Sequence, residues 1–534
     1  MTSIYRFLLV LSLLSVFVSV QPARAASGVV QPPCDEAAFD DAFDAVQSSG
    51  GGTLTFNCGF KTITFSIEKT VYTNVTIDGG DLVTLDGGVV TRLFYVNLGS
   101  TLTLDHITLN GGSSSSDGGA VFNEGTLAVQ NSKFTNNYAF NLGGAIASIG
   151  TLHVTASEFA NNQAYTGGAI HTSSGVAHIT NTDFNENQAN SGGAVASTGE
   201  IEITASDFSE NQAYQGGAVY AHEYTAQVTI NDSHFSQNRV DSAGGAIMAD
   251  ESSSVTVSGG WLQANGAKIG ATINGGAINT ADLAGVTLEN ITLSGNSAFY
   301  GGGINNFGTT WLTNVTLNDN TAEYDGGGIY SYSTLNLFNV TLQNNSAINY
   351  GGGIRNDGTA TLSNVTLSGN HAYGGGGIFN SEAATLQSVT LSGNYATFGG
   401  GINTNGGNTN LRNTVIAHGI QGVNCYKAAG PGSYITSINY NLSDDASCAA
   451  DLNQTHDRNS MDARLGALLD NGGTTLTHLP EADSPLVDQG ECQFGLELDQ
   501  RGVSRPQGAA CDTGAVERRV NEGGNFTFLP VVLR

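Results

Sequence analysis

A two-part signal that returns at a nearly constant interval is the feature that most constrains this chain. Twelve times between Gly118 and Ile402, a pair of glycines and then Ala or Gly precede Ile or Val. Most of these anchors are followed by Phe or Leu, two variable residues and Asn. The anchors are Val121, Ile146, Ile170, Val195, Val219, Ile247, Ile278, Ile304, Ile329, Ile354, Ile378 and Ile402. Such a period is typical of stacked small units, none of which buries its apolar face alone.

Within each repeat, apolar residues alternate with polar ones just before the Phe or Leu. Leu127 and Val129 precede Phe134 in this way, and Val228 and Ile230 precede Phe235. A period of two indicates strands with one buried face, and no helical period competes with it. The sequence therefore predicts an all-β fold, a right-handed parallel β-helix with one coil per repeat and about 4.8 Å between coils.

The recurring Gly and Asn residues have structural roles in this interpretation. Glycine supplies positive φ angles and allows neighbouring backbones to approach closely. Asparagine tolerates the left-handed region, and its side chain can stack on its equivalents as a ladder of amides.

Both ends of the array carry signs of caps. Residues 35–47 place Phe39, Ala42, Phe43 and Val46 on one helical face, which predicts a short amphipathic helix over the first coil. All six cysteines lie outside the repeats, in three local pairs that we expect to form disulfides. These pairs are Cys34 with Cys58, Cys425 with Cys448, and Cys492 with Cys511.

The first 25 residues are predicted to be a secretory signal. Arg6 gives a charged start, residues 7–20 are apolar, and residues 23–25 fit a small-x-small cleavage site. No other apolar stretch approaches the roughly 20 residues of a membrane-spanning helix. The further divisions expected are an N-terminal cap with irregular coils, the repeat array, a C-terminal cap and a tail. They cover residues 26–117, 118–417, 418–517 and 518–534.

The excess of acidic over basic residues limits the classes of molecule that the protein can bind. Without Arg6 and Arg24, 16 of the 18 basic residues remain against 46 acidic ones, a net charge of −30. An acidic surface of this kind argues against binding to nucleic acid or anionic lipid. It remains compatible with cations, with cationic surfaces or with plain solubility.

The paired signals resemble the repeats of polymorphic outer-membrane proteins, a family of surface-exposed autotransporter adhesins. The resemblance covers residues 118–402 and implies a pectin-lyase-like β-helix displayed on a bacterial surface. The chain departs from that family because it has no run of about ten alternating C-terminal strands for a membrane barrel. Self-translocation is therefore not expected.

The C-terminal region is similar to the choice-of-anchor Q domain. The similarity rests on Asp499-Gln500-Arg501-Gly502, Arg505-Pro506 and the stretch from Cys511 to Glu517. It implies that the end of the tail, residues 525–534, serves anchoring to the cell envelope. A final capping strand or a recognition tail for export would explain this apolar stretch as well.

Catalysis is not favoured, because enzymes of the pectin-lyase-like fold need more than the fold. Lyases of this class use clustered carboxylates that hold Ca²⁺ and a basic residue that takes a proton. The few basic residues of the array include Lys133, Arg239, Lys268, Arg355 and Arg412. None of them is expected beside an acidic cluster, and the sequence offers no dense patch of unlike charges across adjacent coils.

One carboxylate group stands out. Glu158, Asp183 and Asp207 occupy the same repeat position in three successive coils and would stack about 4.8 Å apart. The stack is a candidate for a shared cation, Ca²⁺ in the first place, although three solvated acids on a turn explain it as well. No other metal or cofactor is expected.

A row of aromatic residues lies between the Asn and the next glycine pair. Its members are Tyr165, Tyr214, Phe299, Tyr300, Tyr324, Tyr350, Tyr373 and Phe398. Such a row can stack on sugar rings or fill a partner's pockets, or it can simply be a stabilising ladder between coils.

Together these features predict an exported β-helix without enzymatic activity, either secreted or held at the cell surface or outer membrane. We expect an adhesin that binds a glycan or protein of a cell surface or matrix through many weak contacts. A polysaccharide lyase or hydrolase and a structural spacer of the envelope remain the alternatives.

Overall fold

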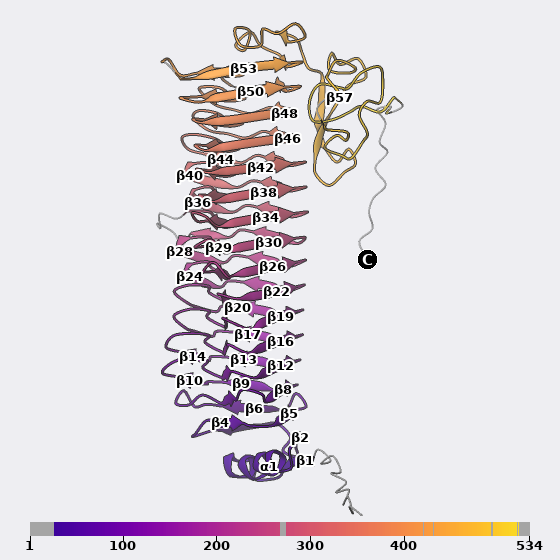
Figure 1. The fold of residues 1–534 in the computed structure, drawn as a ribbon. Helices are drawn as coiled ribbons and strands as arrows, with labels where there is room; N and C mark the ends of the chain where they lie inside the picture. The colour runs from indigo at the N-terminus through magenta and orange to yellow at the C-terminus, as the bar shows by residue number, and fades with distance from the viewer. Residues whose placement is uncertain are drawn as a thin grey trace, which may run out of the picture.

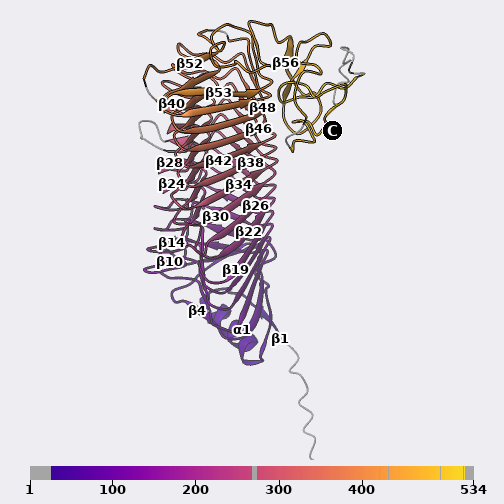
Figure 2. The ribbon, with the colours of Figure 1, turned by 45° about the horizontal axis from the view of Figure 1, so that its top comes forward.

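The computed structural model describes residues 26–267, 274–419, 421–430, 432–492, 495–520 and 522. They form a long rod of stacked coils with one helix at its lower end and an irregular lobe beside its upper end (Figure 1, Figure 2). The predicted signal, residues 1–25, and most of the tail lie outside the described residues.

Successive coils pair in parallel with equivalent residues opposite each other. Leu127 pairs with Leu152, for example, and Ile146 pairs with Ile170. This register confirms the parallel β-helix predicted from the repeats.

The largest sheet, here the long sheet, holds two strands from most coils. Its 32 strands are β1 (Ala26–Val30), β2 (Gly51–Phe56), β3 (Lys61–Thr64), β5 (Asn74–Asp78), β6 (Val83–Asp86), β8 (Thr101–Asp105), β9 (Thr108–Asn110), β12 (Thr126–Gln130), β13 (Lys133–Thr135), β16 (Thr151–Thr155), β17 (Glu158–Ala160), β19 (Val176–Thr180), β20 (Asp183–Asn185), β22 (Glu200–Thr204), β23 (Asp207–Ser209), β26 (Gln227–Asn231), β27 (His234–Ser236), β30 (Ser254–Ser258), β31 (Trp261–Gln263), β34 (Gly285–Glu289), β35 (Thr292–Ser294), β38 (Thr309–Thr313), β39 (Thr316–Asn318), β42 (Thr334–Phe338), β43 (Thr341–Gln343), β46 (Thr359–Ser368), β48 (Ala383–Ser392), β50 (Asn408–Arg412), β51 (Val415–Ala417), β53 (Tyr434–Asn439), β54 (Leu442–Ser443) and β55 (Arg458–Asn459).

A second sheet, the anchor sheet, contains one short strand per coil and begins each repeat at its Ile or Val. Its 15 strands are β4 (Lys69–Val71), β7 (Phe94–Val96), β11 (Val121–Asn123), β15 (Ile146–Ser148), β18 (Ile170–Thr172), β21 (Val195–Ser197), β25 (Val219–Ala221), β29 (Ile247–Ala249), β33 (Ile278–Thr280), β37 (Ile304–Asn306), β41 (Ile329–Ser331), β45 (Ile354–Asn356), β47 (Ile378–Asn380), β49 (Ile402–Thr404) and β52 (Cys425–Lys427).

Short strands also run along the turn between the long sheet and the anchor sheet, and we call them the edge strands. They are β10 (Ser113–Ser114), β14 (Tyr138–Ala139), β24 (Gln212–Gln215), β28 (Arg239–Ala243), β32 (Gly266–Ala267), β36 (Ser297–Tyr300), β40 (Thr321–Asp325) and β44 (Ser346–Ala347). They lie along the left side of the rod in Figure 1.

The two glycines of each pair serve different purposes. Gly143, the first of its pair, has a φ of +61°, which L-residues rarely adopt. Gly144, the second, lies so close to the next coil that an added Cβ would stand 2.1 Å from the Gly168 carbonyl oxygen. Both predicted roles of glycine, positive φ and close backbone approach, are therefore confirmed.

The predicted asparagine ladder is present and buried. Asn187 Nδ2 donates to Asn211 Oδ1 at 3.0 Å and to the Phe159 carbonyl at 2.9 Å, while Asn187 Oδ1 accepts from the Asn162 amide groups. The ladder asparagines do not themselves adopt positive φ. Instead the residue before each one often does, as Glu186 shows with a φ of +53°.

The interior of the rod is a continuous apolar core. Phe134, Phe159, Phe184, Phe208 and Phe235 stack with ring centroids 4.6–5.1 Å apart. From Leu262 onward leucine takes the same inward position. Stacked rings and leucines thus bury the apolar face that a single coil would expose.

Helix α1 (Glu36–Ser48) covers the lower end of this core, as predicted. Asp35 caps the helix, and Phe39, Phe43 and Val46 are buried. The buried Lys69 ammonium binds Glu36 and Asp40 of the helix. Burial alone would raise the pKa of Glu36, but hydrogen bonds from Lys69 and Ser66 outweigh it and lower this pKa to about 2.

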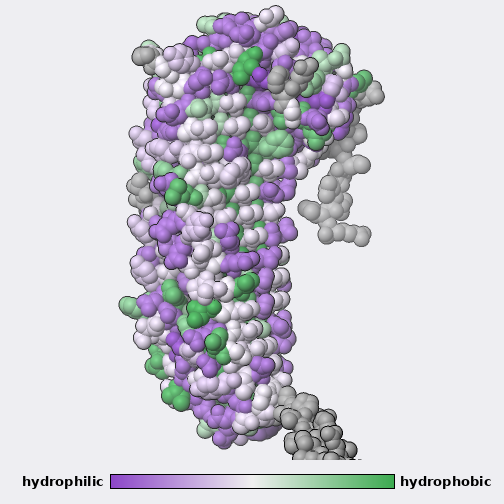
Figure 3. Space-filling view, viewed as in Figure 1, coloured by the Kyte–Doolittle hydropathy of each residue, from purple (hydrophilic) through white to green (hydrophobic). Residues whose placement is uncertain are grey.

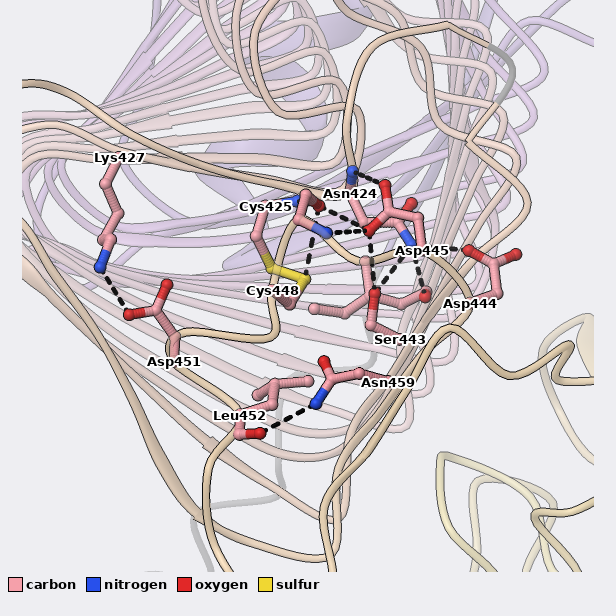
Figure 4. Close-up of a disulfide and its surroundings, with 12 residues drawn as sticks. Asn424, Cys425, Lys427, Ser443, Asp444, Asp445, Cys448, Asp451, Leu452 and Asn459 are labelled. Carbon is pink, nitrogen blue, oxygen red and sulfur yellow. Dashed lines mark hydrogen bonds and ion pairs between the residues drawn. A yellow bond between two sulfur atoms is a disulfide. The ribbon is translucent and has the colours of Figure 1, made fainter.

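All three expected disulfides are formed: Cys34–Cys58, Cys425–Cys448 and Cys492–Cys511. Cys425 belongs to the last strand of the anchor sheet, so its disulfide ties the final coil to the turns above it (Figure 4). Nearby, the backbone N–H of Asn424 donates to Asp445 Oδ2 at 2.9 Å.

The irregular lobe contains the antiparallel pair β56 (Leu465–Leu469) and β57 (Thr477–Pro480) and packs beside the last coils. The Gln500 side chain is buried there, donating to Thr341 Oγ1 at 2.9 Å and accepting from Thr366 Oγ1 at 2.7 Å. Within the described residues, no helix is both long and apolar enough to cross a membrane.

Removing one rung of the ladder should destabilise the rod. In Asn187→Ala, the amide groups of Asn162 lose their acceptor and the Phe159 carbonyl loses a donor, all inside the core. Because buried polar groups without partners cost about 1–3 kcal/mol each, we expect a loss of about 2–4 kcal/mol in the free energy of unfolding. Urea unfolding measures it.

The matched control is Asn185→Ala, two residues earlier in the same coil on the half-buried outer side of β20. It should change stability by less than about 0.5 kcal/mol. Equal losses in the two variants would contradict the role assigned to the ladder.

Candidate ligand-binding edge

The predicted aromatic row divides into two groups with different surroundings. Tyr165 and Tyr214 are 62% and 51% exposed and contact no other ring in the described part of the chain. The remaining members form a second group in which rings touch one another. Figure 3 shows single hydrophobic residues, in green, along the left edge of the lower half of the rod; the two tyrosines are not among them, because tyrosine is slightly hydrophilic on this scale.

The upper group is a packed layer of rings. Phe299 stacks on Tyr324 at 5.2 Å, and Tyr300 meets Tyr324 edge-on at 5.4 Å. Higher up, Tyr373 contacts Phe398 at 5.3 Å, edge to face. Such contacts stabilise neighbouring coils, so this part of the row behaves as the ladder that the sequence left open.

Beneath these rings lies a charged network that the sequence analysis did not anticipate. Arg355 Nη1 binds Asp325 Oδ2 at 2.8 Å, and Arg355 Nε binds Asp357 Oδ2 at 3.0 Å. The guanidinium also lies 5.0–5.5 Å from the ring centres of Tyr330, Tyr350 and Phe379. The expectation that no base lies beside an acidic cluster was therefore wrong here.

The side chains of this network are largely buried, which limits their access to a ligand. Asp325 is 2% exposed, and its burial raises its pKa to about 6 although Arg355 opposes the shift. Tyr330 is buried as well, and its hydroxyl donates to Asp357 Oδ2 at 3.0 Å. Burial, a hydrogen bond with Tyr332 and the charge of Asp357 raise the pKa of Tyr330. The network supports the ring layer from below rather than facing a ligand.

The same kind of support recurs lower on the anchor sheet. The Tyr220 hydroxyl donates to Asp250 Oδ2 at 2.8 Å, and burial with this bond raises the pKa of Tyr220. Tyr95 is held by Glu124, and this hydrogen bond with burial raises the pKa of Tyr95 to about 12. Each tyrosine bonds a carboxylate of the following coil.

The lower group borders a row of open depressions. One is lined by Glu68, Arg92, Ser114, Tyr138 and Phe140 among others, and the next shares Tyr138 and Phe140. A third shares Gln163 and Tyr165 with the second and extends to Tyr214 and Asp241. Because neighbours share walls, the three make one trough along the edge, which we call the edge trough.

The acidic stack is in register, because Glu158 pairs with Asp183 and Asp183 with Asp207. Burial and the two neighbouring carboxylates raise the pKa of Asp183. Basic groups close both ends: Lys133 Nζ binds Glu158 at 2.6 Å, and His234 Nδ1 lies 2.8 Å from Asp207. Lys133 thus also contradicts the expectation that no base stands beside the acids.

A metal site is not apparent at this stack. Among the residues that the structure describes, no group of three or more His, Cys, Asp or Glu side chains is arranged to hold a metal ion. Ca²⁺ binding there stays a prediction from the sequence.

Sequence reasoning missed the polar half of the edge trough. Gln163, Gln188 and Gln212 each stand one residue after a ladder asparagine, and Tyr165 and Tyr214 stand two residues further on. The sequence could have shown this row. Because side chains alternate along an extended segment, the residues one and three positions after each buried ladder asparagine are expected to point outward.

Comparison with known proteins supports the repeat type. Residues 314–332 match the family model of the Chlamydia polymorphic membrane protein repeat. This confirms the resemblance seen in the repeats, and the strand pairing independently establishes the β-helix. No curated protein matches the chain.

Among solved structures, a similar one is a crystal structure of the pectate lyase Pel9A. It is 15% identical, with 92% of this chain and 96% of that chain covered and a TM-score of 0.19. The strand pairing makes the chain a parallel β-helix protein, and the family match shows that it carries a repeat of the polymorphic membrane protein type.

Replacing Arg355 should destabilise the protein in a pH-dependent way. In Arg355→Met, Asp325 and Asp357 lose their shared cation, and we expect a loss of about 3 kcal/mol at pH 8. Asp325 already has a raised pKa, and losing Arg355 raises it further. Since a raised carboxyl pKa adds stability as pH falls through it, part of the loss should disappear at pH 5.

Urea unfolding at the two pH values measures this effect. Lys133→Met, which breaks a largely exposed ion pair, is the control and should cost less than about 1 kcal/mol. A loss in Arg355→Met that is the same at pH 5 and pH 8 would show that the carboxylates are not the cause.

The buried His171 should make the rod sensitive to acid. Burial lowers its pKa to about 4, so the unfolded chain takes up a proton near pH 6.5 while the folded chain does not. The stability that this neutral imidazole contributes is present above pH 6.5 and is lost as pH falls toward 4. In His171→Gln, we expect roughly 3 kcal/mol less acid destabilisation over that range. Parallel acid-unfolding curves for variant and parent would refute this assignment.

Proposed function

We propose that this protein is an exported bacterial surface adhesin whose rod recognises an extended ligand. The observation that carries the proposal is the edge trough, where exposed rings and open depressions follow one another coil after coil. A site repeated along a rod suits a ligand that is itself repetitive, because weak contacts then add up.

Binding is favoured over catalysis by where the ionisable groups lie. The charged network of Arg355, Asp325 and Asp357 is largely buried and packs against rings. A larger set in the lobe is buried too, where Arg501 binds Asp499 and Arg505 binds Glu517. The edge trough, in contrast, holds few charged groups, and Glu68 and Arg92 at its lower end form an ion pair with each other.

Export and surface display are supported by several features of the chain. The predicted signal at residues 1–25 and three disulfides are typical of proteins that mature outside the cytoplasm. The polymorphic membrane protein repeat adds a family in which the repeat belongs to membrane-associated proteins. The tail would then serve anchoring.

The test is affinity electrophoresis of the purified protein through gels that contain neutral or acidic polysaccharides. We expect retardation by at least one polymer, and at least about tenfold weaker binding for the combined variant Phe140→Ser, Tyr165→Ser, Tyr214→Ser. These rings are exposed, so the fold should survive.

Trp311→Ser is the matched control, because Trp311 is similarly exposed but lies on the outer side of the long sheet. It should bind like the parent. Absence of retardation by every polymer would favour a structural spacer over glycan recognition. Polymer that is shortened after the run would favour the lyase or hydrolase alternative.

A further inference from the structure

The edge trough is built from two parallel rows of outward side chains. The first row follows the ladder asparagines and pairs from coil to coil: Tyr138 with Gln163, Gln163 with Gln188, and Gln188 with Gln212. The second row stands two residues later and holds Phe140, Tyr165, Asn190 and Tyr214. Between the rows lie small alanines, of which Ala139, Ala164 and Ala213 are buried. The trough therefore has a floor of small side chains, with mainly amides along one side and mainly rings along the other.

The amides of the first row are available. Gln163, Gln188 and Gln212 are exposed, and their side chains make no hydrogen bond within the described residues. Each carboxamide offers two donors and an acceptor, which suits hydroxyl groups that both donate and accept. Flat apolar faces of pyranose rings can meanwhile lie on Tyr165 and Tyr214.

The charge of the edge trough favours neutral polymers over anionic ones. The middle depression is lined by no charged side chain, and in the next one Asp241 is the only charged residue in the lining. The chain carries a net charge of −28, so a polyanion meets repulsion without a row of cations to offset it. Arg92 at the lower end is already paired with Glu68.

We propose that the edge trough binds a linear, uncharged polysaccharide that lies along the rod axis, with the glutamine row hydrogen-bonding its hydroxyl groups and the ring row stacking on its sugar faces. This inference rests on the proposed adhesin function and specifies its ligand.

The spacing of the rings makes the ligand's length matter. Tyr165 and Tyr214 stand two coils apart, or about 10 Å, and Phe140 adds another coil. A single sugar cannot reach two rings, whereas a chain of several units touches rings and amides together. Affinity should therefore rise steeply between a monosaccharide and an oligosaccharide.

The experiment compares neutral polymers, such as hydroxyethyl cellulose and galactomannan, with acidic ones, such as polygalacturonate and alginate. We expect retardation by a neutral polymer, little change on adding salt, and no retardation by the acidic ones. In the combined variant Gln163→Ala, Gln188→Ala, Gln212→Ala, binding should weaken at least about tenfold.

Gln130→Ala with Gln227→Ala, two exposed glutamines on the long sheet, is the matched control and should bind like the parent. Retardation by acidic polymers alone would overturn this inference and leave the adhesin proposal standing. The same holds if the glutamine variant binds normally while the ring variant fails. If no polymer retards the parent, both proposals fall, and a structural spacer is the favoured alternative.

Discussion

In-register parallel pairing of successive coils is the constraint on which this molecule depends. It is secured inside by the asparagine ladder, in which each amide joins three coils, and at the corner by glycines that allow the backbones to touch. Because equivalent residues always stand above one another, every repeat position becomes a row on the surface. The function of such a rod is therefore decided by rows and not by clusters near in sequence.

Features that belong to one coil and its immediate neighbours could be predicted from sequence. The period gave the anchors, the inward Phe and Leu, the ladder asparagines and the acidic stack, and local spacing gave the three disulfides and helix α1. Each of these depends only on which residues share a repeat position. The glutamine row also depends only on a shared repeat position, so it could have been predicted from the sequence as well.

Features that depend on how side chains fold over one another could not be predicted. Arg355 reaches Asp325 across 30 residues, because the edge strand places that carboxylate against the anchor sheet. The split of the aromatic row has the same origin. Only packing shows that Tyr300 and Tyr324 cover a buried network while Tyr165 and Tyr214 stand free in solvent.

The lobe explains part of a change in the repeat, the part that falls in the coils beside it. In early coils the residue before the inward Phe is charged, as in Glu158 or Asp183, whereas in later coils it is threonine. Thr341, Thr366 and Thr390 are buried, and they bond to the lobe at Leu476, Gln500 and Ala515. Because the hydrogen bonds here link the lobe only to coils near the upper end, coils could be added or lost further down without disturbing it. The distance between the edge trough and the lobe is thus an adjustable quantity, and related rods could differ in length while both of these parts stay the same.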